Sequence, residues 1–368
     1  MPRLFAALLS LTLAACVTAD PDDWPFVAEP VATLDEPWAL AFLPDGRALV
    51  TQKRGSVLIV DTATGDSVAV DGVPEVAYGG QGGLGDITPH PEYAENGLVY
   101  LSWAEADDDG NRGAVVGRAR LAEDGNGARL EALEVIWRQT PKVSGRGHYG
   151  HRLLFDNEGY LFISSGERQK FDPSQDMTSN MGKIVRLFDD GRLPDDNPFS
   201  ADGGVAAEVW TLGHRNPLGI DFDAEGRLWN SEMGPKHGDE LNLVIPGRNY
   251  GYPLVSNGDH YSGKTIPDHD TRPDLEAPKA WWDPSIAPSS LHFVKGGSFT
   301  DWQGDALIGG LVSQALIRVR IDGDTASEIE RYEMGERIRD VAQGPDGTLW
   351  LIEDGGQGRL LRLNPRAP

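Results

Sequence analysis

Residues 157–164 read Asn157-Glu158-Gly159-Tyr160-Leu161-Phe162-Ile163-Ser164, which predicts a tight turn followed by an apolar β-strand. Glycine adopts the positive φ that tight hairpin turns need without steric cost, and Asn or Asp adopts it at low cost. The same pattern of a polar, glycine-containing turn and a strand recurs at residues 44–51, 95–102, 224–231, 303–309 and 345–352, weakest at 303–309. Repetition of one turn–strand unit indicates a repeat architecture built from strands.

The spacing of the copies indicates how the strands are grouped. Consecutive turn glycines are 51, 62, 67, 78 and 43 residues apart, which suits four short strands with loops of variable length. No stretch carries a sustained 3.6-residue apolar period with caps, so we expect no long helix. Repeated four-stranded units close radially into a β-propeller, which leaves few open sheet edges. We therefore predict an all-β fold over residues 36–365, a six-bladed β-propeller of four-stranded antiparallel blades. A β-sandwich or two tandem β domains would not demand one turn motif at six similar spacings.

The composition bounds the class of protein. The chain has 368 residues with 45 Gly, 25 Pro and 10 Trp, which is typical of a turn-rich globular protein rather than a disordered one. Its formal net charge is −24 and is spread over the whole chain. Because phosphate binding needs a basic face, this charge argues against a nucleic-acid partner.

The N-terminal residues resemble a bacterial export signal. A positive charge precedes an apolar run at residues 4–13, which is too short to span a bilayer. Leu13-Ala14-Ala15-Cys16 resembles a lipobox in which Cys16 would carry the lipid, and cleavage after Ala19 is the alternative. Since Cys16 is the single cysteine, we expect no disulfide in the mature chain. We predict a signal peptide over residues 1–19, a tether over residues 20–35, and a periplasmic or lipid-anchored location at the bacterial envelope.

A glycine-rich polar loop, Ser144-Gly145-Arg146-Gly147-His148-Tyr149-Gly150-His151-Arg152, precedes the first strand of this central segment. Loops at the end of a rigid sheet often present catalytic groups. His148 is the candidate general base, because the unperturbed pKa of histidine lies near neutral pH. A histidine that bonds only to backbone is the alternative, and His151 is a competing candidate. Glu167, after the next strand, could orient a histidine in the same pocket or be a solvated surface carboxylate.

Two further polar loops carry arginines. Arg215 and Asn216 offer a fork of donors with an added donor and acceptor, which suits a carboxylate, while a loop held by an arginine salt bridge is the alternative. Arg337 and Arg339 alternate with an apolar residue before a strand, so both lie on one face. Two like charges on one face are costly unless an anion lies between them, which indicates an anionic ligand. We expect the three polar loops to open onto one shared pocket.

The competing interpretation of Arg337 and Arg339 is an ion pair with Glu333, Glu336 or Asp340, which are close in the sequence.

A metal site is suggested by the segment from Glu232 to Glu240, which contains a Gly-Pro turn with acids nearby. Ca²⁺ prefers oxygen ligands, backbone carbonyls included. The segment matches no EF-hand, and the chain has no zinc-binding pattern. No Gly-x-Gly-x-x-Gly motif opens a helix after a strand and no Walker loop is present, so we expect no nicotinamide or nucleotide cofactor.

Taken together, several segments in order resemble the soluble pyrroloquinoline-quinone-dependent sugar dehydrogenases, the glucose/sorbosone dehydrogenase family. The resemblance runs from about Glu36 to Asn364. It rests on Pro37–Phe42, Gly80–Asp86, Gly213–Pro217, Gly234-Pro235 with Asp239-Glu240, Asn249–Pro253, Ile286–Ser289 and Arg337–Asp340. Leu193-Pro194-Asp195-Asp196-Asn197-Pro198-Phe199 is similar to the bacterial aldose dehydrogenase branch.

The resemblance implies a six-bladed propeller and assigns the site. His148 would take the proton of the sugar's anomeric hydroxyl while hydride passes to the quinone, and Arg215 counts with it as a catalytic residue. Gly234 and Pro235 would give carbonyl oxygens to Ca²⁺, which polarises the cofactor. Gln81 would contact either the sugar or the cofactor. The residues implied to hold the tricarboxylate quinone are Arg215, Asn216, Arg337 and Arg339.

Two positions depart from the family pattern. Leu218 stands where the family usually has Gln, and Val312 aligns with a cofactor-binding Lys. Charge-assisted hydrogen bonds contribute roughly 1.5–3 kcal/mol each, so the affinity for the quinone could fall by orders of magnitude. Arg318 or Lys295 are the substitutes that the sequence offers.

We therefore predict a dehydrogenase that oxidises a small-molecule aldose to its lactone with pyrroloquinoline quinone and Ca²⁺. The departures at Leu218 and Val312 leave two alternatives open: a Ca²⁺-dependent lactonase or hydrolase, or a non-enzymatic sugar-binding propeller, each without the quinone. The sugar, the electron acceptor and the oligomeric state are not predicted.

Overall fold

The computed structural model describes residues 21–125 and 127–366, so the predicted signal peptide with Cys16 lies outside the described residues. In the described part, 24 strands form five sheets, and the longest α-helix is α1, Tyr93–Asn96. The prediction of an all-β fold without long helices is therefore confirmed. In this part of the chain no helix has the length and apolar character needed to cross a membrane.

Four of the sheets hold four antiparallel strands each. The first joins both ends of the described chain and contains β1 (Phe26–Leu34), β24 (Gly358–Pro365), β23 (Leu349–Glu353) and β22 (Ile338–Gln343). The second contains β10 (Gly150–Phe155), β11 (Tyr160–Ser165), β12 (Lys183–Phe188) and β13 (Val209–Leu212), and the third contains β14 (Pro217–Phe222), β15 (Leu228–Glu232), β16 (Asp239–Leu243) and β17 (Ala280–Trp282). The fourth contains β18 (His292–Phe293), β19 (Ala306–Gly310), β20 (Ala315–Asp322) and β21 (Thr325–Glu333). The fifth sheet holds β2 (Pro37–Phe42), β3 (Ala48–Gln52), β4 (Ser56–Val60), β5 (Ser67–Asp71), β9 (Gly127–Arg138), β8 (Arg112–Asp124), β7 (Leu98–Ala106) and β6 (Leu84–Pro89), in that order.

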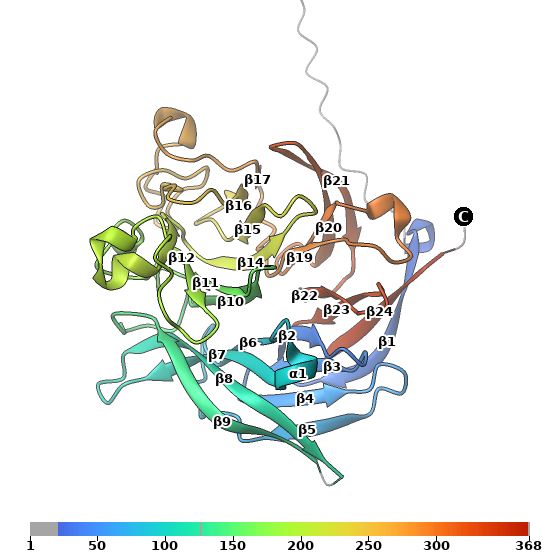
Figure 1. Ribbon diagram of the computed structural model, residues 1–368. Helices are drawn as coiled ribbons and strands as arrows, with labels where there is room; N and C mark the ends of the chain where they lie inside the picture. Colours follow the sequence, from blue (N-terminus) through green and yellow to red (C-terminus); the bar gives the residue numbers. More distant parts are fainter. Residues whose placement is uncertain (1–20, 126, 367–368) are drawn as a thin grey trace, which may run out of the picture.

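The sheets lie around a common centre (Figure 1). Their innermost strands are β2, β6, β10, β14, β18 and β22; each contacts the next, and β22 contacts β2, which closes the ring. This radial arrangement is a β-propeller. The fifth sheet is continuous because the outer strands β5 and β9 pair in parallel over two residue pairs. The prediction of six separate blades is therefore not confirmed.

The repeated turn–strand unit has one structural role throughout. In the six predicted turns, the glycines at positions 46, 97, 159, 226, 304 and 347 have φ between 67° and 88°. Each turn leads into the second strand of a four-stranded unit, and those strands are β3, β7, β11, β15, β19 and β23. The positive-φ requirement predicted from the sequence is confirmed at every copy, the weakest included.

The predicted tether over residues 20–35 is wrong for most of its length. Residues 26–34 form β1, which pairs antiparallel with β24 at the C-terminal end of the chain. Phe26 is fully buried and packs edge-on against Tyr332 and Trp302. Burying this aromatic ring and pairing the backbone of β24 stabilises the segment as a strand, so the propeller begins near residue 26 rather than 36.

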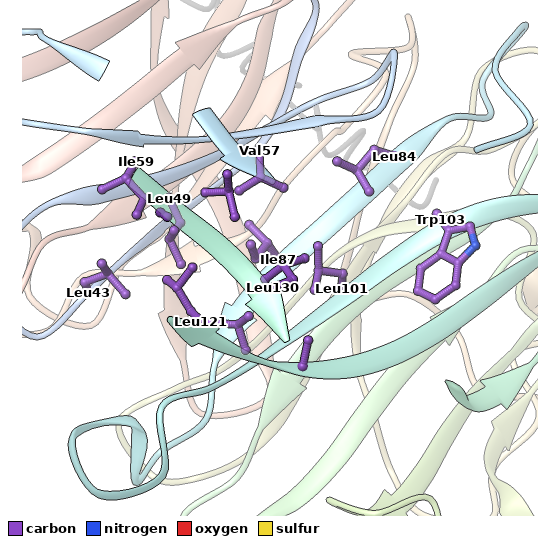
Figure 2. Close-up of a cluster of buried hydrophobic side chains, with 14 of the residues drawn as sticks. Leu43, Leu49, Val57, Ile59, Leu84, Ile87, Leu101, Trp103, Leu121 and Leu130 are labelled. Atoms are coloured by element: carbon purple, nitrogen blue, oxygen red, sulfur yellow. The ribbon is translucent and has the colours of Figure 1, made fainter. Parts of the chain in front are cut away.

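The core lies between neighbouring four-stranded units, those of the continuous fifth sheet included. Figure 2 shows the largest cluster, in which Leu49, Ile87 and Leu101 come together from β3, β6 and β7. Alternate residues of each strand point into such clusters, as expected for packed sheets. The inner strands are thereby held rigidly, and the loops at their ends have a fixed base.

Candidate active site

A cavity of about 380 Å³ lies where the loops before the innermost strands meet the loops after the second strands. In antiparallel units these two sets of loops emerge at the same edge, so residues far apart in the chain converge there. Of the predicted site residues, Gln81, Asn216, Arg337 and Arg339 line the cavity, and so does the competing candidate His151. Tyr149 and Gly150, which follow His148, line it as well. The residues that line it do not include His148, Arg215, Gly234 or Pro235. The three polar loops thus reach one pocket region, as expected.

His148 and Glu167 form a buried hydrogen-bonded pair. His148 Nδ1 lies 2.5 Å from Glu167 Oε1, and the exposed fractions of the two residues are 5% and 0%. The other Glu167 oxygen accepts backbone N–H groups of Lys170 and, at 2.7 Å, Phe171. The backbone N–H of His148 donates to Gln81 Oε1 at 2.6 Å. The prediction that Glu167 orients a histidine is borne out in position, and the solvated-carboxylate interpretation is wrong.

The electrostatics keep His148 neutral. Burial lowers the pKa of His148, and Arg215 lowers it further, while the bond to Glu167 opposes both. Burial raises the pKa of Glu167, but the hydrogen bond and charge of His148, the Phe171 N–H and Arg215 together outweigh it, so this pKa is lowered. A neutral ring that donates Nδ1–H to an ionised carboxylate leaves Nε2 as the acceptor. The pair therefore has the composition of an oriented base.

The loop that carries His148 is held in a strained conformation by Arg168. His148 has φ of 49°, a left-handed value that is costly for a residue with a side chain. The Arg168 guanidinium donates to the carbonyls of Gly147 and Gly145 at 2.8 Å each and lies 3.8 Å from the centroid of the Tyr149 ring. These contacts offset the cost and fix the direction of the His148 ring. No pattern in the sequence had marked Arg168.

His151, the competing candidate, lines the cavity but is held there by packing contacts. Its Nδ1 lies 2.9 Å from Ser102 Oγ and its ring lies 4.9 Å from the ring of Trp38. Burial lowers the pKa of His151 to about 3, and among the described residues no carboxylate is hydrogen-bonded to its ring. With no acidic partner to orient it, His151 lacks the arrangement that His148 has.

Asn216 lines the cavity, and its neighbour Arg215 has hydrogen-bonding capacity that the described residues do not use. Arg215 Nη1 donates to the carbonyl of Met233 at 3.0 Å, while its Nε is buried without a hydrogen-bond partner among the described residues. Asn216 lines the cavity, and its Oδ1 accepts the Gly150 N–H at 3.3 Å. Arg215 forms no salt bridge within the described part of the chain, so the alternative drawn for it is not supported.

Arg337 and Arg339 share one carboxylate, Asp354. Arg337 Nε lies 2.8 Å from Oδ2, and Arg339 Nη2 lies 2.7 Å from Oδ1. Ile338 between them is fully buried, so the predicted alternation is confirmed. Burial tends to raise the pKa of Asp354, yet the two arginines lower it overall. The anion between the two arginines is thus Asp354, the first residue after the neighbouring strand β23. It is none of the three acids close in the sequence, Glu333, Glu336 and Asp340.

The predicted metal loop is tightly built. The Gly234 N–H donates to Asp239 Oδ1 at 2.9 Å, and the other oxygen accepts the N–H groups of Ile286 and Ala287 at 2.8 and 2.7 Å. A Cβ at Gly234 would lie 2.2 Å from the Gly238 carbonyl oxygen, so only glycine fits. Within the described residues no three His, Cys, Asp or Glu side chains gather as a metal site. Coordination of Ca²⁺ by the carbonyls of Gly234 and Pro235 therefore stays a prediction.

The two positions that depart from the family pattern, Leu218 and Val312, differ in their relation to the cavity. Leu218 lines the cavity, whereas Val312 is 59% exposed and does not. Neither proposed substitute reaches the cavity. Arg318 bonds to Asp305 and Glu330, and Lys295 Nζ lies 3.3 Å from an oxygen of Asp221 near the opposite end of the ring.

A third basic side chain, Lys53, lines the cavity, and no sequence pattern predicted it. Lys53 follows β3 and lines the same cavity as Arg337 and Arg339, together with the acids Glu36 and Asp354. These positions come from opposite ends of the chain, and no local pattern links them.

The residues present fit an anionic cofactor that carries carboxylates. Three cations line the cavity in a chain of net charge −24, and the buried Nε of Arg215 points to a missing acceptor. Guanidinium groups bind carboxylates through paired donors. Gln81 and Asn216 add neutral donors and acceptors.

Comparison with known proteins shows the family of this chain. The "Glucose / Sorbosone dehydrogenase" family model matches residues 34–362. "Aldose sugar dehydrogenase YliI" of Escherichia coli is 41% identical over 339 residues, covering 90% of this chain and 91% of that protein. The apo-form structure of the soluble aldose sugar dehydrogenase from Escherichia coli is 40% identical with a TM-score of 0.88, covering 93% and 100% of the two chains. The PQQ-bound aldose sugar dehydrogenase from Streptomyces coelicolor is 30% identical with a TM-score of 0.75, covering 92% and 97%.

Proposed function

Since this chain belongs to the glucose/sorbosone dehydrogenase family, we propose that it oxidises an aldose to its lactone with His148 as the general base. The observation that carries this proposal is the buried His148–Glu167 pair beside a cavity that Arg337 and Arg339 line. The family supports a sugar dehydrogenase of the pyrroloquinoline quinone type, and a small-molecule sugar as substrate. The two quinone-free alternatives are not favoured by any relative reported above.

His148 removes the proton. With Nδ1–H donated to Glu167, the lone pair of Nε2 accepts the proton of the anomeric hydroxyl. The lowered pKa of His148 keeps this lone pair free at neutral pH, and the carboxylate of Glu167 stabilises the imidazolium that forms. When bound, pyrroloquinoline quinone would supply a two-electron acceptor for the hydride of the anomeric carbon, which would leave the sugar as its lactone, and Ca²⁺ would supply Lewis-acid polarisation of that acceptor.

The other predicted residues bind and orient. Arg337 and Arg339 hold carboxylates, Gln81 contacts sugar or cofactor, and Asn216 and its neighbour Arg215 hold the cofactor. Arg215 also lies close enough to lower the pKa of His148, which supports its assignment as catalytic. The carbonyls of Gly234 and Pro235 are the proposed ligands of Ca²⁺. Rigid bonds to Asp239 support this loop geometry.

The blade count and the location of the protein complete the proposal. Counted by innermost strands, the fifth sheet divides into the units β2–β5 and β6–β9, and the propeller then has six blades. Export through residues 1–19, with a lipid on Cys16 or cleavage after Ala19, places the enzyme at the bacterial envelope.

Reconstitution of the purified mature chain with pyrroloquinoline quinone and Ca²⁺ tests the proposal. We expect saturable binding by absorbance titration, followed by aldose-dependent reduction of an artificial electron acceptor. Failure to bind the quinone at high concentration in the presence of Ca²⁺ would reject the dehydrogenase.

A further inference from the structure

Lys53 is fixed at the cavity by its backbone and by its ammonium group. Its N–H donates to the Glu36 carbonyl and its carbonyl accepts the Leu84 N–H, both at 2.9 Å. A Cβ at Gly83 would lie 2.1 Å from that carbonyl oxygen, so the two backbones are in close contact. Nζ donates to the Gly80 carbonyl at 2.6 Å, on the same cavity wall as Gln81. The half-buried side chain is therefore placed at the cavity.

The positive charge of Lys53 is not neutralised by an ion pair. Asp354 is engaged by Arg337 and Arg339, and Glu36 is engaged by Arg54 at 3.0 Å and by the Tyr78 hydroxyl at 2.7 Å. Among the described residues no carboxylate lies within 4.0 Å of the Lys53 ammonium, whose acceptor is the Gly80 carbonyl. An ammonium has three donors, so hydrogen-bonding capacity remains for an anion in the cavity.

Lys53 lies with the two arginines rather than apart from them. Burial lowers the pKa of Lys53, and the charges that act on it include Arg339, which lowers the pKa, and Glu36 and Asp354, which raise it. Lys53, Arg337 and Arg339 thus form one cationic wall. Asp354 offsets the charge of the two arginines, so Lys53 is the member of this wall whose charge a bound anion would offset.

We propose that Lys53 is a cofactor-binding residue that pairs with a carboxylate of the quinone, and so supplies the cation that Val312 lacks. This inference rests on the proposed function. Val312 does not line the cavity, Arg318 and Lys295 have carboxylate partners elsewhere, and Lys53 is the lysine among the residues that line it. The cation thus comes from the loop after β3 instead of the loop after β19.

The test compares Lys53→Met with Lys53→Arg by absorbance titration of pyrroloquinoline quinone at fixed Ca²⁺. Loss of a charge-assisted hydrogen bond costs about 1.5–3 kcal/mol, so Kd for Lys53→Met should rise by about 10- to 150-fold. Lys53→Arg should stay within a few-fold of wild type. The dependence of Kd on ionic strength should be shallower in Lys53→Met, because one ionic contact is gone. Lys295→Met is the matched control, and its Kd should not change.

The outcomes separate the two proposals. Wild-type binding together with an unchanged Kd and salt dependence in Lys53→Met overturns the role of Lys53 alone. No binding by the wild type overturns the proposed function and this inference with it. Thermal unfolding of each variant reports whether the fold persists, and Lys53→Gln replaces Lys53→Met if the latter unfolds.

Discussion

Arg152 reaches Asp340 across the ring of innermost strands, with Nη1 3.1 Å from Oδ2. Arg152 lies on β10 and Asp340 on β22, which occupy opposite positions in the ring. The same guanidinium donates to the carbonyls of Leu218 and Ser289 at 2.7 and 2.6 Å, and it lies 4.3 Å from the centroid of the Trp38 ring. With Asp86 of β6 at 3.5 Å, Arg152 links all the innermost strands or the residues before them. The base of the active site is therefore tied together by one side chain.

We expect Arg152→Met to destabilise the fold strongly. Removing one partner of a buried ion pair costs about 3–5 kcal/mol, because Asp340 and Asp86 stay buried without their countercharge. The free energy of unfolding from urea titration measures the loss. Arg129→Met is the control, since this arginine is exposed and pairs only at the surface, and its midpoint should match wild type. Equal midpoints for both variants would show that Arg152 does not hold the ring together.

His148→Gln should lose turnover while keeping the cofactor. A general base contributes about 10²- to 10⁴-fold to the rate, so kcat should fall by that factor. The Kd for the quinone should stay close to wild type, because the His148 ring contacts Glu167 rather than the cationic wall. Turnover near the wild-type rate would remove His148 from the role of base.

Glu167→Gln should shift the pH profile of kcat/KM, in a direction set by the hydrogen bond between His148 and Glu167. The bond to Glu167 raises the pKa of His148 against burial, so its removal lowers that pKa further. Turnover requires unprotonated His148, and kcat/KM falls as the pH drops through the His148 pKa. The acid limb should therefore move to lower pH in the variant, while kcat falls by up to about 10⁴-fold because the imidazolium loses its countercharge.

The pH profile of kcat/KM separates this role from a purely structural one. A fall in kcat with an unshifted acid limb would mean that Glu167 only supports the loop through Lys170 and Phe171.

Gly234→Ala should impair Ca²⁺ binding. The new Cβ would lie 2.2 Å from the Gly238 carbonyl oxygen and 2.3 Å from that of His237, so the loop must move. Displacing the residues that support metal ligands costs about 10- to 100-fold in affinity. Calorimetric titration of the metal-free chain with Ca²⁺ measures it. Gly127→Ala, where an added Cβ meets no atom within 4 Å, is the control. Wild-type Ca²⁺ affinity in Gly234→Ala would place the metal elsewhere.

The local elements of the fold could be predicted because their causes are local. A glycine that needs positive φ and an apolar strand after it occupy adjacent positions, so the turns at Gly46 and Gly347 could be recognised directly. The prediction of a tether is wrong for residues 26–34 because the strand that pairs with them, β24, lies at the other end of the chain. Pairing over that separation has no signal in the segment itself.

The sequence by itself determined which residue types stand at the ends of the strands: His148, Arg215, Arg337 and Arg339 follow or precede recognisable strands. Only the tertiary structure decided their partners, because ring closure brings together loops from opposite ends of the chain. Asp354 lies between the arginines since β22 and β23 are paired, and Lys53 joins them because β2 packs against β22. Turn chemistry and alternation act within a few residues, whereas the charge balance of a cavity depends on every loop that faces it.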